Sequence, residues 1–220
     1  MLTQHSLDFL KDLAQNNNRE WYHDNKKRYE KELKKPFENL VTAAIAEVQK
    51  VDPEVEIPAR KAIFRIYRDT RFSKDKTPYK THVSAIIGPG GTKNKMYPGF
   101  YLHVEPGMLM LGGGAYFLDT QSLYQVREFI MQNKDRFNQL ITDPTFVAKY
   151  ETLRGEQNKR LPKELTKAAE EQPLLYNKQF YYMAELPPDH VLREDFLDFM
   201  MEYYMAAKPV KDFLKEALKL

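Results

Sequence analysis

AIFRIYRDTRFSKDKTPYKTHVSAII, residues 62–87, is the stretch that decides the fold. Apolar and polar residues alternate from Ala62 to Asp69 and strand character returns from Thr81 to Ile87, which is the period of strands with one buried face. Between them, Ser73 to Pro78 is rich in turn-forming residues, and Pro78 disfavours a helix at the residue before it. The stretch therefore predicts two strands joined by a loop.

The same stretch concentrates positive charge. Between Arg60 and Lys80, eight Lys or Arg residues stand against two Asp, a net charge of +6, whereas the whole chain of 220 residues carries +3. Such a segment raises the local concentration of anions, and an arginine grips carboxylate or phosphate in two places. We therefore expect an anionic ligand at this segment. The candidate ligand-binding residues are Arg65, Tyr67, Arg68, Arg71, Lys74, Lys76 and Tyr101.

More strands follow along the chain, and together they indicate the fold class. Strands are expected at about 99–105, 108–111 and 179–185, and Pro106-Gly107 forms a tight turn between the first two. Strands joined by short turns favour an antiparallel meander. The sequence predicts an α+β fold, with an antiparallel sheet of about four to five strands and helices packed mainly on one face.

The expected helices lie before and after these strands. Apolar residues recur there at the spacing of amphipathic helices, the last two at 195–207 and 209–218. Because the strands have one apolar face, they need the helices to cover it. The prediction is a single domain over residues 1–220, with a helical N-terminal part (3–51), the meander (about 62–114) and a mainly helical C-terminal part (119–219).

Four stretches of the chain resemble a known family. The longest is RIYRDTRFSKDKTPYKTH (65–82), and the others are NNNREW (16–21), GFYLHVEP (99–106) and LGGG (111–114). Together they resemble the signature of a bacterial and fungal family of conserved hypothetical proteins, domain of unknown function family 2461. The resemblance spans most of the chain and implies one intact domain. It brings no catalytic residues with it.

Composition excludes several classes of protein. The chain has no cysteine, which excludes disulfides, thiolate metal sites and cysteine nucleophiles. Its apolar runs are far shorter than the ~20 residues that cross a bilayer, and residues 1–15 lack the pattern of a signal peptide. We expect a cytoplasmic protein without a membrane partner.

Period-two spacing predicts a polar sheet face, composed of Arg65, Tyr67, Asp69, His82, Ser84, Tyr101, His103 and Glu105. His82, His103 and Glu105 are the candidate catalytic residues, because histidine transfers protons near neutral pH. Arg65 would neutralise negative charge that develops beside them. The alternative is an ordinary half-solvated sheet, which commonly alternates polar and apolar residues.

A metal site is a further hypothesis at this face. His103 and Glu105 lie side by side on one strand, and His82 or Asp69 would join them. Histidine with carboxylate suits zinc, manganese or iron. Because the pair is short of a full ligand set and no helical His-Glu-x-x-His pattern exists, no metal ligands are assigned, and the cofactor stays undetermined.

Two other features carry weaker signals. Gly112-Gly113-Gly114 precedes an expected helix, whose first amides could contact phosphate, but no phosphate-loop or dinucleotide fingerprint is present. Glycines there are better explained by close packing or a strand bend. Ser73 and Ser84 lack the context of a nucleophile.

The functional prediction is a protein that binds an anionic, phosphate-bearing ligand at the basic loop (residues 70–78) and the polar sheet face. Whether it is an enzyme stays undecided. The alternative is a non-catalytic module whose basic loop docks an acidic protein or nucleic acid, although no recognised nucleic-acid motif is present. In a third hypothesis the long motif is mainly structural and its charges are satisfied internally, which pairing of Arg65 and Arg68 with Asp69 or Glu105 would support.

Overall fold

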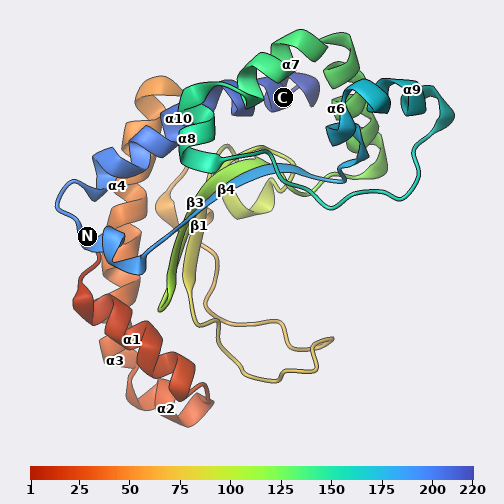
Figure 1. Ribbon diagram of the computed structural model, residues 1–220. Helices are drawn as coiled ribbons and strands as arrows, with labels where there is room; N and C mark the ends of the chain where they lie inside the picture. Colours follow the sequence, from red (N-terminus) through yellow and green to blue (C-terminus); the bar gives the residue numbers. More distant parts are fainter. The chain divides into compact units, whose positions relative to one another are not determined.

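Four strands form an antiparallel sheet in the order β1-β2-β3-β4 in the computed structural model, which describes residues 1–220. They are β1 (Val83–Ile87), β2 (Phe100–Glu105), β3 (Met108–Ala115) and β4 (Phe180–Leu186), and Figure 1 labels three of them. With helices over more than half of the chain, the predicted α+β class is confirmed, and the antiparallel sheet has four strands where about four to five are expected.

The chain groups into two compact units, which are described in turn. Unit 1 comprises residues 1–93, 101–111 and 185–201, and unit 2 comprises residues 94–100, 112–184 and 202–220. The single domain with three consecutive parts stays a prediction. None of the helices combines the length and the apolar character that crossing a membrane requires.

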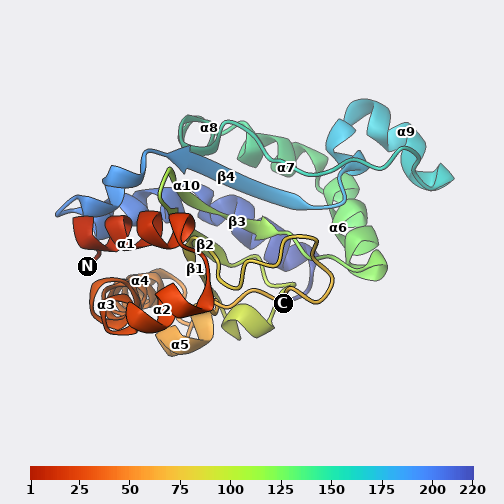
Figure 2. The ribbon, with the colours of Figure 1, turned by 90° about the horizontal axis from the view of Figure 1, so that it is seen from below.

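Unit 1 begins with helices. They are α1 (Gln4–Gln15), α2 (Arg19–Asp24), α3 (Lys26–Arg28), the π-helical turn η1 (Tyr29–Lys34), α4 (Lys35–Val51) and α5 (Ala59–Ala62). Asn18 caps the start of α2, where its side chain accepts a hydrogen bond from the Trp21 amide. Apolar residues on one side of α1 and α4 are fully buried, among them Leu10, Leu13 and Leu40. Figure 2 shows α5 beside α4, and the two helices are in contact.

The segment before β1 differs from the strand expected at 62–69. Residues 59–62 form the short helix α5. Residues 63–67 form no regular strand and pair through two isolated β-bridges, one to β1 and one to the chain before it. The bridges join Ile63 to Ala85 and Tyr67 to Tyr79. Between the two bridges, the segment before the loop advances by four residues and the segment after it by six. The two extra residues form a bulge, and Thr81 and His82 adopt bends there. Bulges of this kind redirect side chains.

An aromatic cluster fastens this segment to the helices of unit 1. The rings of Tyr22 and Tyr79 stack with centroids 4.0 Å apart, and Tyr67 lies 6.1 Å from Tyr22. The Asn17 side chain donates to the Tyr79 carbonyl and accepts from the Tyr79 amide. Burial raises the pKa of Tyr29, in the same cluster, to about 12.

Unit 2 contains the helices α6 (Thr120–Gln132), α7 (Lys134–Ile141), α8 (Pro144–Tyr150) and α9 (Lys163–Glu171). It also contains β4 and most of α10 (Phe196–Ala217). Sequence predicts two helices in place of α10, but Pro209 lies inside one continuous helix. The large buried residues Phe137, Tyr182 and Phe213 belong to its core.

The glycine run Gly112-Gly113-Gly114 extends β3 beyond the expected end at Leu111. A Cβ atom at Gly112 would lie 2.4 Å from the Tyr182 carbonyl oxygen, and one at Gly114 would lie 2.4 Å from that of Phe180. Gly114 also has a φ of +105°, which side-chain-bearing residues rarely adopt. The glycines therefore serve close packing against β4, as the sequence suggests.

Candidate functional site

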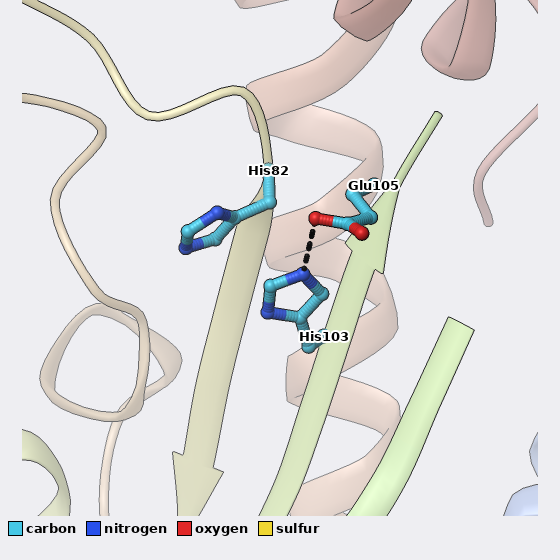
Figure 3. Close-up of side chains that lie close together, drawn as sticks. All are labelled: His82, His103 and Glu105. Atoms are coloured by element: carbon cyan, nitrogen blue, oxygen red, sulfur yellow. Dashed lines mark hydrogen bonds and ion pairs between the residues drawn. The ribbon is translucent and has the colours of Figure 1, made fainter. Parts of the chain in front are cut away.

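Two histidines and a glutamate come together on the polar face of β1 and β2 (Figure 3). His103 and Glu105 share this face because they are two residues apart on β2. His82 reaches it from the bulge before β1, and its ring stacks on His103 with centroids 4.2 Å apart. Each of the three side chains offers one ligand atom, and these atoms all lie within 4.8 Å of one another.

A hydrogen-bonded chain holds His103 in place. Its Nε2 lies 3.2 Å from Oε2 of Glu105, and its Nδ1 lies 3.0 Å from the hydroxyl of Tyr101. The Tyr101 hydroxyl also bonds to the buried Ser84. When Nε2–H donates to the carboxylate, Nδ1 accepts from Tyr101. His103 is buried, so both its position and its ring orientation are defined by this chain.

The surroundings of both rings favour the neutral form of the imidazole. Burial lowers the pKa of His82 to about 4, with His103 and Lys80 adding to the effect. Burial also lowers the pKa of His103, which the bond to Glu105 opposes. Neutral imidazole is the form that offers a lone pair to a metal ion or a proton.

Lys80 supplies the positive charge beside these rings. Burial lowers the pKa of its ammonium group, and the nearby Arg65 lowers it further. Its Nζ lies 5.3 Å from the centroid of the Phe64 ring, which in turn contacts Tyr101 edge-on. No carboxylate pairs with Lys80 in the structure. A half-buried cation without an acidic partner favours an anion nearby.

The basic loop (residues 70–78) differs from this face, because Arg71 within it and Arg68 just before it both have acidic partners. Arg71 forms two hydrogen bonds to Asp69, of 3.0 and 2.8 Å. Arg68, which precedes the loop, contacts the carboxylate of Asp75. These contacts lower the pKa of both aspartates to about 2, through Arg71 at Asp69 and through Thr77 and Arg68 at Asp75. Arg68 and Arg71 are thus paired internally, although in other pairs than the third hypothesis names, and Arg65 pairs with neither Asp69 nor Glu105.

Other predicted residues lie apart from the histidines. Arg65 is exposed and forms no hydrogen bond or ion pair, and Tyr67 belongs to the aromatic cluster of unit 1. Lys74 is exposed, and Lys76 donates to the Thr70 carbonyl at 2.8 Å. The structure therefore brings His82, His103, Glu105 and Tyr101 together and leaves the loop residues outside the cluster.

Sequence reasoning missed two contributors to the site, Lys80 and Phe64. Lys80 precedes His82 by two residues, and residues two apart on a strand share one face. This spacing could have identified Lys80 as a neighbour of the histidines. Phe64 lies beside Tyr101, on the side expected for Arg65, because the bulge shifts the pairing of this segment. No sequence pattern marks that bulge.

Comparison with protein families gives one full-length match. The family model described as "Conserved hypothetical protein (DUF2461)" matches residues 5–213 of the 220. This range includes the whole site. No curated protein matches the chain.

Proposed function

Because the chain belongs to the DUF2461 family of conserved hypothetical proteins, we propose its function from the geometry of the sheet face: metal-dependent binding of an anionic, phosphate-bearing ligand. The observation that carries the proposal is the set of three ligand atoms of His82, His103 and Glu105 within 4.8 Å of one another. The metal would be a divalent ion that accepts two imidazoles and a carboxylate, such as zinc, manganese or iron.

The distances suit such an ion. A tetrahedral zinc site with bonds of about 2.0–2.2 Å holds neighbouring ligand atoms about 3.3 Å apart. His103 Nε2 and Glu105 Oε2 are already 3.2 Å apart. Side-chain rotation of His82 at the bulge would complete the set. Three protein ligands leave at least one position open, as catalytic metal sites do.

Neighbouring groups would orient the ligands. With an ion on Nε2 of His103, Nδ1 would carry the proton and would donate to the Tyr101 hydroxyl, 3.0 Å away. Partners of this kind fix the ring and raise its basicity. Tyr101, and Ser84 behind it, would therefore orient His103 as a ligand.

The anion would bind to the open position of the metal and to Lys80. A phosphate group carries enough negative charge to pair with both, and Arg65 is near enough to lower the pKa of Lys80. An ion with an open position polarises a phosphoryl oxygen or activates water, which is the chemistry that this site would support.

Thermal unfolding with added ions tests the proposal. Zn²⁺, Mn²⁺ and Co²⁺ would each be added to protein stripped with chelator, alone and with inorganic phosphate, AMP or uncharged adenosine. An ion at a hundred times its Kd stabilises by about 2.7 kcal/mol, or about 5–10 °C for a chain of this size. AMP and phosphate, but not adenosine, should add to the shift.

Matched variants locate the effect. His82→Asn and Glu105→Gln should abolish the shift, whereas His23→Asn, at an exposed histidine of α2, should retain it. Absence of any ion-dependent shift, or an equal loss in His23→Asn, would overturn the metal. An ion shift without an added effect of AMP would overturn the phosphate ligand only.

A second candidate function is docking through the basic loop. Phe72 has 95% of its surface exposed between Arg71 and the exposed Lys74. An aromatic ring beside cations stacks on nucleic-acid bases while the cations contact phosphates. A fluorescent single-stranded RNA titrated over a range of salt would test it: Phe72→Ser should weaken binding, and His82→Asn should not. A salt-independent affinity would contradict phosphate contacts.

A further inference from the structure

A pocket lies within unit 2, beside the first turns of α6. Its volume is about 580 Å³, which suits a small organic molecule. The residues 116–120 before and at the start of α6 form one part of its wall, and Lys178 and Gln179 form another. This pocket shares no residue with the histidine cluster.

Half of the residues that line this pocket are aromatic or aliphatic. Tyr116, Phe117 and Tyr124 line it and remain 38–53% exposed. Leu118, Leu123 and Pro162 complete the apolar lining. Exposed aromatic rings around a concave surface are a feature of ligand sites, because they bury a large apolar area when a ligand binds.

Arg127 places an unpaired cation in this apolar wall. It lines the pocket and is only 4% exposed. Its Nη2 donates to the Asn177 carbonyl at 3.0 Å, but its Nε is buried without a partner and no carboxylate pairs with the guanidinium. Burial alone lowers its pKa. A buried charge with an unsatisfied donor is unfavourable unless an anion or an acceptor completes it.

Asn177, the residue that Arg127 contacts, carries a second unsatisfied donor. It is 1% exposed, and its Nδ2 is buried without a partner. Two adjacent buried residues thus have free N–H groups and no acceptor. The Asn177 amide lies beside Gly155, outside the pocket lining. Buried donors in native proteins are nearly always satisfied, so the lining residue Arg127 is the one that favours an oxygen-bearing group in the pocket.

We propose that the pocket binds a small aromatic carboxylate, with the carboxylate at Arg127 and the ring against Phe117, Tyr116 and Tyr124. One guanidinium matches one carboxylate in charge and shape. The other charged groups in the lining are Lys178, 3.5 Å from Glu156, and Asp119, which accepts from the Ser122 amide. Because Lys178 is paired with Glu156, Arg127 is the one cation of the lining without an acidic partner, which suits a monoanion better than a phosphate.

Saturation-transfer NMR and calorimetry with defined probes test this site. Benzoate and indole-3-acetate should bind, whereas benzamide, hexanoate and inorganic phosphate should bind at least tenfold more weakly. Equal binding of benzamide would overturn the role of Arg127. Equal binding of hexanoate would overturn the aromatic preference, and binding of phosphate alone would overturn the carboxylate.

Variants assign the contact to the pocket. Arg127→Met removes the buried charge and keeps similar bulk, so the fold should survive, and benzoate affinity should fall at least tenfold. Phe117→Ala, at a half-exposed ring, should weaken indole-3-acetate more than benzoate and serves if Arg127→Met fails to fold. His23→Asn, at the exposed histidine of α2 in unit 1, should change neither affinity. Unchanged benzoate binding in Arg127→Met or in Phe117→Ala would overturn the proposal.

Discussion

The basic loop and the histidine cluster are both parts of the polar, positively charged region of unit 1, yet their charges differ in availability. In the loop, Arg71 is bonded to Asp69 and Arg68 to Asp75. At the cluster, Lys80 has no acidic partner and its pKa is lowered by burial. The number of charged residues in a stretch of sequence therefore does not tell how many of those charges are free to bind a ligand. Burial and the local supply of carboxylates decide that.

The strongest test of this contrast is the support of His103. Tyr101→Phe removes the hydroxyl that lies 3.0 Å from Nδ1 of His103, so the ring loses its orienting partner. We expect metal affinity to fall about 10–100-fold, measured by Zn²⁺ competition with a chromophoric chelator. Arg71→Gln, in the loop, should leave it within twofold. Equal effects of the two changes would erase the distinction between the regions.

A substitution of Lys80 is expected to have an intermediate effect on affinity, and the direction of the change for each ligand is what tests the role of this charge. Lys80→Met removes a cation that disfavours positive charge on both histidines. Metal affinity should rise and AMP affinity should fall, each by about tenfold, because like charges repel and opposite charges attract over short distances. Parallel titrations of Co²⁺ and AMP would measure both. A fall in both affinities would indicate that Lys80 is needed for folding of the site, not for its charge.

The periodicity of the sequence is sufficient to predict much of this region. Alternation in residues 99–105 places His103 and Glu105 on one face, and the structure keeps that arrangement on β2. The turn at Pro106-Gly107 and the close packing of the glycine run are also local properties. Local spacing is set by backbone geometry, which every sequence shares.

The remainder depends on contacts between distant segments. The bulge at Thr81 and His82 arises from unequal pairing of Ile63 with Ala85 and of Tyr67 with Tyr79, and no residue pattern announces it. It places Phe64 beside Tyr101 where alternation predicts Arg65. The unpaired Arg127 is likewise invisible in sequence, because burial and the absence of an acid nearby are tertiary properties.

The smallest effect is expected in the loop, and it depends on pH. Contacts with Arg71 at Asp69, and with Thr77 and Arg68 at Asp75, lower the pKa of both carboxylates to about 2. Since the folded pKa lies below the usual value of about 3.8, the pairing contributes fully above that pH and is lost as pH falls through about 2. Because both pairs lie at the surface, their loss should shift the overall unfolding temperature little.

Carboxyl carbon shifts in NMR would follow the two aspartates as the pH is lowered. Arg71→Gln should move the midpoint of Asp69 back towards 3.8 and leave Asp75 unchanged, because Asp75 is held by Thr77 and Arg68. If both midpoints already lay near 3.8 in the unaltered chain, the loop arginines would be free. The loop would then be as available to an anion as Lys80, and the contrast between the two regions would fail.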